Sequence, residues 1–159
     1  MSYQAVILTV SDSCAAGTRT DTSGPAIRAM LENAGFAVQA MQTVPDEEEQ
    51  ISAAIVHACD ILQADLVVTT GGTGLSPRDV TPEATLAVLD REIRAIPVAM
   101  WVDGLKSTPR AMLSRAVAGT RGHTLVLNVP GSEKAARENL GAVVATLDHA
   151  LRMLAGGGH

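Results

Sequence analysis

Apolar residues gather in four short runs along the chain, and each run has the length of a β-strand. The runs at residues 5–11, 66–70 and 124–129 are almost continuously aliphatic. Such runs are typical of parallel strands that are buried on both faces. The pattern therefore predicts strands at Ala5–Ser11, Phe36–Val44, Leu66–Thr70 and Thr124–Val129.

The segments between these runs have the 3.6-residue period of amphipathic helices. The clearest stripe runs from Ile51 through Ile55 to Leu62, and Pro residues just inside two other segments mark helix starts. Residues 111–122 fit either a short strand pair or irregular structure. The predicted helices cover Ser23 to about Gly35, Glu47–Leu62, a segment beginning at Thr81, Ile93–Lys106 and Ser132–Leu154.

Strands that alternate with helices of this size indicate an α/β fold with a mainly parallel sheet. The chain has 159 residues and shows no internal repeat or linker, so we expect residues 1–159 to form a single domain. Only 2% of the residues are aromatic, whereas 47% are hydrophobic. The core is therefore expected to be aliphatic.

The charge distribution argues against two classes of partner. The net charge is −5, only two lysines are present, and no run of basic residues occurs. Nucleic acids and membrane surfaces both select for clustered positive charge, so neither is expected as a partner. No apolar stretch approaches the length of a transmembrane helix.

The N-terminal apolar run leads directly into Ser11 and Asp12, which indicates a strand and not a signal peptide. Cys14 and Cys59 lie far apart and form no C-x-x-C pair. A reduced, cytoplasmic protein is the natural interpretation.

Polar loops follow the carboxyl ends of the predicted strands, where open parallel sheets bind their ligands. One of them begins Gly71-Gly72-Thr73-Gly74, a sequence that suits either phosphate binding by backbone amides or a plain tight turn. A Walker A loop is excluded because no lysine has that context. A dinucleotide fingerprint is excluded because Pro77 stands where its third glycine belongs.

Two aspartates lie in these loops. Asp46 precedes a predicted helix and has Glu49 three residues later, so it can form a capping box, a catalytic contact or both. Asp79 extends the glycine loop ahead of the helix, whose cap is better assigned to Thr81. Asp79 either holds Mg²⁺ against substrate phosphates or forms a surface pair with Arg78.

The segment Asn128-Val129-Pro130-Gly131-Ser132 joins the last strand to the last helix. Ser132 suits a helix N-cap, and the same helix start can bind an anion. The four histidines, including the terminal His159, show no metal-ligand spacing. Zinc sites and hydrolytic triads are therefore not expected.

Several motifs in this order resemble one known family. They are V-S-D-S at Val10–Ser13, D-T-S-G-P at Asp21–Pro25, V-P-D-E at Val44–Glu47, T-T-G-G-T-G-L-S-P-R-D-V-T-P-E-A-T at Thr69–Thr85, T-P-R-A-M-L-S-R-A-V-A-G at Thr108–Gly119 and N-V-P-G-S at Asn128–Ser132. Together they are similar to the molybdenum-cofactor biosynthesis domain shared by MogA, MoaB and the G domains of gephyrin and its plant counterpart. The resemblance covers essentially the whole chain.

The resemblance implies a molybdopterin adenylyltransferase that uses ATP and Mg²⁺ and releases pyrophosphate. It implies a three-layer α/β fold, a homotrimer, and a separate insertase that receives the activated cofactor. A non-catalytic, MoaB-like molybdopterin carrier is the alternative.

The family's two essential aspartates fall on Asp46 and Asp79, and Asp79 is the expected Mg²⁺ ligand. The remaining expected binding residues are Ser11, Gly71, Gly72, Thr73, Gly74, Ser114, Asn128, Pro130, Gly131 and Ser132. The segment Arg91–Met100 departs from many bacterial members and is closer to the plant and animal G domains. This departure bears on the oligomer contact and the pocket rim, and not on the aspartates.

Overall fold

Six strands form one central sheet in the computed structural model, which describes residues 2–157. The four predicted strands all form, each within one residue of its predicted limits. They pair in parallel, β1 lying between β2 and β3, and β6 lying beyond β3. The strands are β1 (Gln4–Val10), β2 (Ala37–Val44), β3 (Leu66–Thr70) and β6 (Thr124–Val129).

Two short strands that the apolar pattern did not reveal complete the sheet. β5 (Ala118–Arg121) pairs antiparallel with β6, and β4 (Arg91–Glu92) pairs antiparallel with β5. Gly119 lets these strands approach closely, because a Cβ at this position would collide with the backbone oxygen of Arg91. Residues 111–122, for which the sequence left two alternatives, thus contain one strand. It is preceded by the 3-10 helix η2 (Pro109–Leu113).

The helices after residue 22 agree with the predicted segments, with one local difference, whereas the short helix at Asp12–Ala15 forms in a polar loop where no helix was predicted. The helices are α1 (Asp12–Ala15), α2 (Ser23–Asn33), α3 (Glu48–Val56), α4 (Thr81–Leu86), α5 (Ala95–Gly104) and α6 (Glu133–Leu154). The helix expected to reach Leu62 ends instead in a π-helical turn, η1 (His57–Ile61), where the Leu62 amide donates to the His57 carbonyl.

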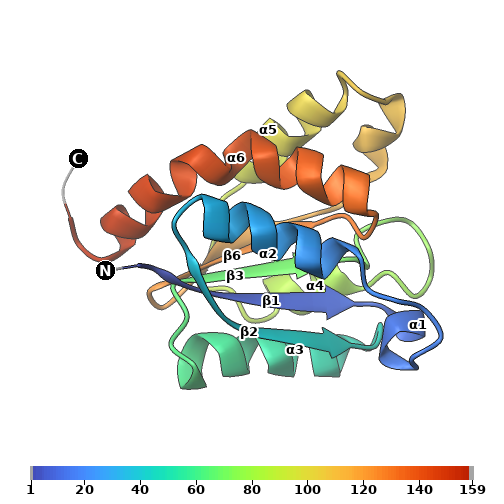
Figure 1. The fold of residues 1–159 in the computed structure, drawn as a ribbon, viewed down its shortest axis with the longest axis horizontal. Helices are drawn as coiled ribbons and strands as arrows, with labels where there is room; N and C mark the ends of the chain where they lie inside the picture. The colour runs from blue at the N-terminus through green and yellow to red at the C-terminus, as the bar shows by residue number, and fades with distance from the viewer. Residues whose placement is uncertain (1, 158–159) are drawn as a thin grey trace.

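Helices cover both faces of the sheet, which gives three layers and confirms the expected α/β architecture (Figure 1). Along β1, Ala5 and Ile7 pack towards α2 and α6, whereas Val6, Leu8 and Val10 pack towards α3 and η1. This alternation explains why the strand is apolar at almost every position. α5 packs against α6 on the first of these faces.

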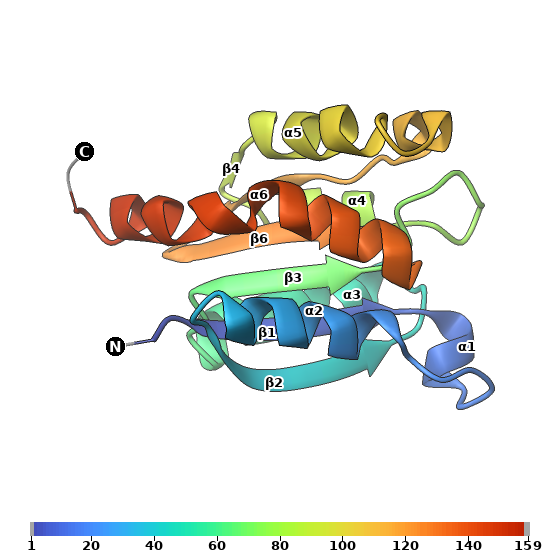
Figure 2. The same cartoon turned by 45° about the horizontal axis from the view of Figure 1, so that its top comes forward.

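The connections reverse direction between β1 and β3. The chain leaves β1 through α2 to reach β2 on one side, and returns through α3 to β3 on the other side. A crevice forms outside the carboxyl ends of two strands at such a switch point. Figure 2 shows the segment between β3 and α4 extending past this end of the sheet, near the start of α6. The topology therefore places the polar loops at one edge.

Candidate functional site

A cavity of about 800 Å³ opens at the carboxyl ends of the parallel strands. All four predicted loops contribute to its wall, as expected from the topology. They supply Ser11 after β1, Asp46 after β2, Gly71 to Gly74 and Asp79 after β3, and Pro130 to Ser132 after β6. Ser114 lines the same cavity from the segment between η2 and β5. The structure thus brings together every predicted site residue except Asn128.

The glycine loop is fixed in a conformation that other residues do not adopt readily. Gly71 has φ +102, and a Cβ there would collide with the backbone oxygen of Val10. The Thr81 hydroxyl donates to the Gly71 carbonyl at 2.9 Å, and the Thr81 amide donates to the Gly72 carbonyl at 3.1 Å. Thr81 therefore anchors the loop and does not cap α4, which corrects the predicted cap.

Asp46 also differs from its predicted capping role. Glu47 occupies the N-cap position of α3 and makes no side-chain cap bond. Instead, an Asp46 carboxylate oxygen accepts the Asp12 amide at 2.9 Å, and an Asp12 oxygen accepts the Asp46 amide at 2.9 Å. This reciprocal pair joins the end of β2 to the start of α1. The capping-box interpretation was wrong, and the Asp46 side chain lies at the cavity instead.

The electrostatic surroundings of Asp46 favour a cation. Partial burial raises the pKa of its carboxyl group, while the Asp12 amide opposes the shift and the nearby charges of Asp12 and Asp79 add to it. Arg78 compensates for only part of this negative charge. The negative charges of Asp12 and Asp79 therefore both act on the Asp46 carboxyl group.

Asp79 lies at the C-terminal end of the same loop. Its carboxylate accepts the Ser76 amide at 3.1 Å and faces Gly74, where an added Cβ would lie 2.9 Å from the Asp79 Oδ2 atom. The alternative surface pair with Arg78 is wrong, because Arg78 binds Asp12 and Glu47 at 3.0 and 2.9 Å. The Asp79 carboxylate is thus left facing the cavity.

Two serines of the site each cap a helix and also line the cavity. Ser11 caps α1 by accepting the Cys14 amide at 3.2 Å, and Ser132 caps α6 by accepting the Ala135 amide at 3.3 Å. The predicted N-cap at Ser132 is confirmed. Both residues also line the cavity, as does the buried Thr73.

Asn128 lies behind the cavity wall. Its side chain is fully buried, and its amide nitrogen donates to the hydroxyls of Thr69 and Thr85 at 2.8 and 3.1 Å. Its amide oxygen accepts the Val117 amide at 3.1 Å. The expected contact between Asn128 and the pocket is therefore not found, because the residue ties β6 to β3, α4 and the segment before β5.

The cavity includes residues that the sequence reasoning did not single out. Asp21 accepts the Thr9 hydroxyl at 2.8 Å and the Gly24 amide at 3.0 Å, so it both lines the cavity and holds the start of α2. Its position just before Ser23, Gly24 and Pro25 was the available signal. The other unpredicted lining residues include Arg19, Thr108, Arg110, Lys134 and Asn139.

Three of these residues supply positive charge. Arg19, Arg110 and Lys134 line the cavity, and none of them forms an ion pair with another residue of the described range 2–157. An acidic protein therefore presents cationic side chains and amide groups at one cavity. This combination suits a ligand with several anionic groups.

Residues 2–157 lack two further features, a cluster of metal-binding side chains and a membrane-spanning helix. No group of three or more His, Cys, Asp or Glu side chains has the arrangement of a metal site there. No helix in this range is long and apolar enough to cross a membrane.

Comparison with known proteins extends these observations. Residues 6–149 match the family described as "Probable molybdopterin binding domain". The chain is 42% identical to gephyrin from Dictyostelium discoideum and 37% identical to molybdopterin adenylyltransferase from Helicobacter pylori. These alignments cover 93% and 94% of this chain, and 22% and 86% of the respective relatives.

The solved structures agree with the fold. The crystal structure of the molybdopterin biosynthesis enzyme MoaB from Thermus thermophilus superposes with a TM-score of 0.92, at 49% identity and 97% coverage of both chains. The chain spans only 22%, 25% and 49% of the length of three curated relatives that it matches. A family match over most of the chain, with the same fold at high identity, places the protein among the molybdopterin-binding domains of molybdenum cofactor biosynthesis, the family of MogA and MoaB.

Proposed function

We propose that this chain is a molybdopterin adenylyltransferase. The observation that carries the proposal is the convergence of Asp46 and Asp79 on one glycine loop, inside a cavity of about 800 Å³. Such a volume lies in the usual range for sites that bind small molecules. The relative from Helicobacter pylori bears this activity in its name and aligns over 94% of this chain.

The reaction joins two anionic substrates. An oxygen of the terminal phosphate of molybdopterin attacks the α-phosphorus of ATP, and the bond between that phosphorus and the bridging oxygen to the β-phosphate breaks. The electron pair leaves with pyrophosphate. Since a phosphate is already a competent nucleophile, catalysis reduces to positioning and charge neutralisation.

The residues present fit a Mg²⁺ ion. A Cβ on Gly72 would lie 3.1 Å from an Asp46 oxygen, and one on Gly74 would lie 2.9 Å from an Asp79 oxygen. Both carboxylates thus face the space that the glycines leave open, and Mg²⁺ prefers one or two carboxylates together with substrate phosphates. When bound, the ion would neutralise charge on the phosphates. Asp79 is the proposed ligand, and Asp46 orients the ion or the pterin.

The other residues of the cavity bind and orient the substrates. The amides of Gly71 to Gly74 and the hydroxyl of Thr73 would donate to phosphate oxygens. Ser11, Ser114 and the segment Pro130–Ser132 would contact the pterin and the nucleotide. Asn128 would act indirectly, because its buried amide holds the wall behind these contacts. Arg19, Arg110 and Lys134 would balance the remaining negative charge.

One incubation tests the proposal. The protein, molybdopterin, ATP and Mg²⁺ should give adenylylated molybdopterin, detected by its mass, together with an equal amount of pyrophosphate. Chelation of the metal should stop the reaction. Asp46→Asn and Asp79→Asn should each stay folded and lose transfer. Folded variants that react at the wild-type rate would refute the assignment of the two aspartates.

A molybdopterin carrier without transferase activity is the second candidate, since the family that residues 6–149 match is described by binding alone, as a "Probable molybdopterin binding domain". Both candidates predict molybdopterin binding. Only the enzyme predicts release of pyrophosphate that depends on both Mg²⁺ and ATP. The two aspartates at the cavity favour the enzyme.

The proposed setting is a cytoplasmic homotrimer in which residues 1–159 act as one unit and a separate insertase consumes the product. Val98, Val102 and Leu105 form an exposed apolar strip on and just after α5, which supports an oligomer. Sedimentation equilibrium should give three times the chain mass of 16.5 kDa. A monomer across micromolar concentrations would refute the trimer.

A further inference from the structure

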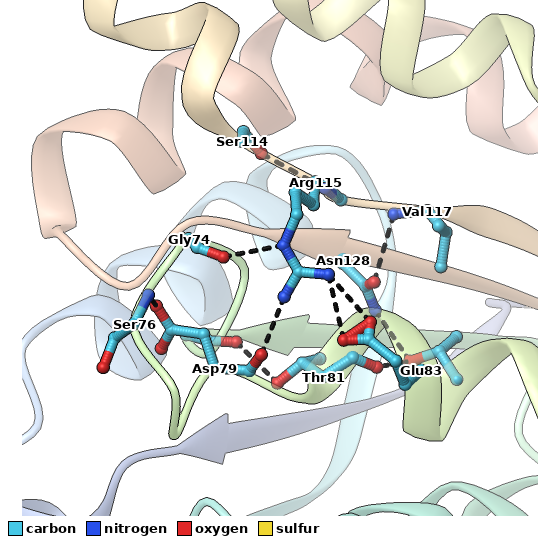
Figure 3. A network of polar contacts seen from close by, with 12 residues as sticks. Gly74, Ser76, Asp79, Thr81, Glu83, Ser114, Arg115, Val117 and Asn128 are labelled. Carbon is cyan, nitrogen blue, oxygen red and sulfur yellow. Dashed lines mark hydrogen bonds and ion pairs between the residues drawn. The ribbon is translucent and has the colours of Figure 1, made fainter.

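Arg115 forms hydrogen bonds with several residues of the site, a role that no sequence motif indicated. Its Nε atom donates to the Gly74 carbonyl at 2.8 Å, and its Nη2 atom donates to the Asp79 carbonyl at 2.7 Å. Its Nη1 atom donates to both Glu83 carboxylate oxygens, at 2.9 and 2.8 Å. Its backbone amide donates to the Thr73 carbonyl at 2.8 Å. Figure 3 shows the guanidinium group lying between Gly74, Asp79 and Glu83.

These contacts hold both ends of one loop. Gly74 and Asp79 bound an exposed segment, residues 75–78, in which Leu75 is 67% exposed. Inside the segment, the Ser76 amide donates to the Asp79 carboxylate at 3.1 Å, and the Asp79 amide donates to the Ser76 carbonyl at 2.9 Å. Arg78 holds the outer part of the segment through Asp12 and Glu47. The guanidinium group of Arg115 is bonded to the carbonyl groups at both of its ends, Gly74 and Asp79, and so holds their separation.

Glu83 keeps the guanidinium group in place. It lies in the first turn of α4, and its contact with Arg115 raises the pKa of the guanidinium. A planar guanidinium group donates in several fixed directions at once, whereas a lysine ammonium group is a compact point charge. A lysine can therefore keep the charge at this position without bridging Gly74, Asp79 and Glu83 together.

We propose that Arg115 is a positioning residue, which sets the Asp79 carboxylate for adenylyl transfer by holding both ends of the 74–79 loop. The inference rests on the proposed function and deepens it. A shift of about 1 Å in a catalytic group can lower a rate about a hundredfold. Loss of the bridge should therefore lower kcat while leaving molybdopterin binding intact, because the other walls of the cavity do not depend on Arg115.

The test compares Arg115→Lys with Arg121→Lys. Arg121 is a suitable control, since its guanidinium group also binds both a carboxylate and the backbone. Its Nε and Nη2 atoms donate to the Asp60 carboxylate, and its Nη1 atom donates to the Val88 carbonyl. It lies near the amino end of β6, at the edge of the sheet away from the cavity. Both variants should lose a similar amount of thermal stability, so fold damage alone would affect them alike.

Three measurements decide the role of Arg115. Amide hydrogen exchange in residues 74–80 should be about tenfold faster in Arg115→Lys than in the wild-type protein and unchanged in Arg121→Lys. The kcat for adenylyl transfer should fall about 10- to 100-fold in Arg115→Lys only. The Kd for molybdopterin, titrated without ATP or metal, should stay within about twofold in both variants. Arg115→Ala should recover part of its kcat when methylguanidinium is added.

The failure of each proposal gives a different result. Wild-type protein that transfers no adenylyl group refutes the proposed function. Equal loop exchange, or equal kcat per folded molecule, in wild type and Arg115→Lys refutes the role of Arg115. An equal loss of kcat in Arg121→Lys also refutes it, because the effect would then follow general stability.

Discussion

The two aspartates of the site are held in different ways. Asp46 follows a long parallel strand, and its carboxylate and amide exchange hydrogen bonds with Asp12. Asp79 lies in an exposed loop, and it is held through its backbone carbonyl by Arg115 and through its carboxylate by one amide. Each carboxylate accepts one backbone amide, but only the backbone of Asp79 is also held by a side chain, that of Arg115.

This difference separates rigidity from adaptability within one site. The Asp46 carboxylate cannot move without breaking its hydrogen bond with the Asp12 amide, which joins the end of β2 to the start of α1. The Asp79 carboxylate can shift when the phosphates of a substrate enter, provided that Arg115 still holds both ends of its loop. We therefore expect Asp46 to set the position of the reaction and Asp79 to follow the substrate.

Lengthening each side chain tests this comparison most severely. Asp46→Glu should lower kcat about 100- to 1000-fold, because an extra methylene displaces the carboxylate from its bond with the Asp12 amide. Asp79→Glu should lower kcat only about tenfold, since the loop can take up part of the displacement. Steady-state transfer assays at saturating Mg²⁺ would measure both.

Asp148→Glu is the control, because Asp148 is an exposed residue of α6 that pairs with Arg152. It should leave kcat unchanged. Equal losses in Asp46→Glu and Asp79→Glu would show that the two carboxylates are held with equal rigidity.

The turn that both aspartates face gives the next largest effect. Gly71→Ala places a Cβ against the Val10 carbonyl at φ +102, so it should lower the free energy of unfolding by about 2–4 kcal/mol. Gly35→Ala is matched, since Gly35 has φ +95 with no atom near its missing Cβ, and it should cost about 1 kcal/mol. Urea denaturation would measure both losses. Equal losses would mean that the contact with Val10 does not restrict the turn.

The sequence predicted the part of this molecule that depends on local patterns. Continuous aliphatic runs identified β1, β3 and β6 because both faces of these strands are buried. The switch point then followed from the order of the elements, and it placed Asp46, Asp79 and the glycine loop at one cavity. β4 was not predicted, and β5 was only one of two alternatives for residues 111–122, because both strands are short and lack a continuous aliphatic run.

The hydrogen-bond partners were beyond the reach of the sequence. Local rules assigned Asp46 and Thr81 to helix caps, whereas tertiary contacts with Asp12 and Gly71 use those groups instead. Arg115 lies 36 residues from Asp79, and no periodicity or motif spacing relates the two. Asn128 followed the right motif, yet burial directs its amide away from the cavity.

Substitution of Arg78 tests the proposed rigidity of Asp46 with a smaller expected effect. Arg78→Gln removes the bridge to Asp12 and Glu47, but it leaves the backbone bonds of Asp46 in place. Because these side chains are about half exposed, the melting temperature should match that of Arg28→Gln, which removes a similar exposed pair with Glu32. The kcat should change less than about fivefold. A loss as large as that of Arg115→Lys would contradict the proposed rigidity of Asp46.

The smallest expected effect concerns stability and pH. Burial raises the pKa of Asp46, so the protonated carboxyl group suits the fold better than the ionised one. The wild-type protein should therefore lose stability as the pH rises through that pKa. Arg78 lowers the pKa of Asp12, so its ionised form stabilises the fold, and this contribution should disappear as pH falls towards acid values. Asp46→Asn should therefore melt slightly above wild type at pH 7, and Asp12→Asn slightly below it.

The difference for Asp46 should close as the pH falls below about 4, the usual aspartate range, whereas the difference for Asp12 should persist to lower pH, because Arg78 lowers the pKa of Asp12 in the folded state. Thermal melts between about pH 2 and pH 7 with a metal chelator present would measure them. Asp12 and Asp46, whose carboxylates each accept the other residue's backbone amide, would then contribute with opposite sign. The reason is that Arg78 lies against Asp12 and only partly offsets the charge around Asp46. A shift of the same sign in both variants would mean that the pair shares its charge as one group, and the Asp46 carboxylate would then lack the uncompensated charge that favours a cation at the glycine loop.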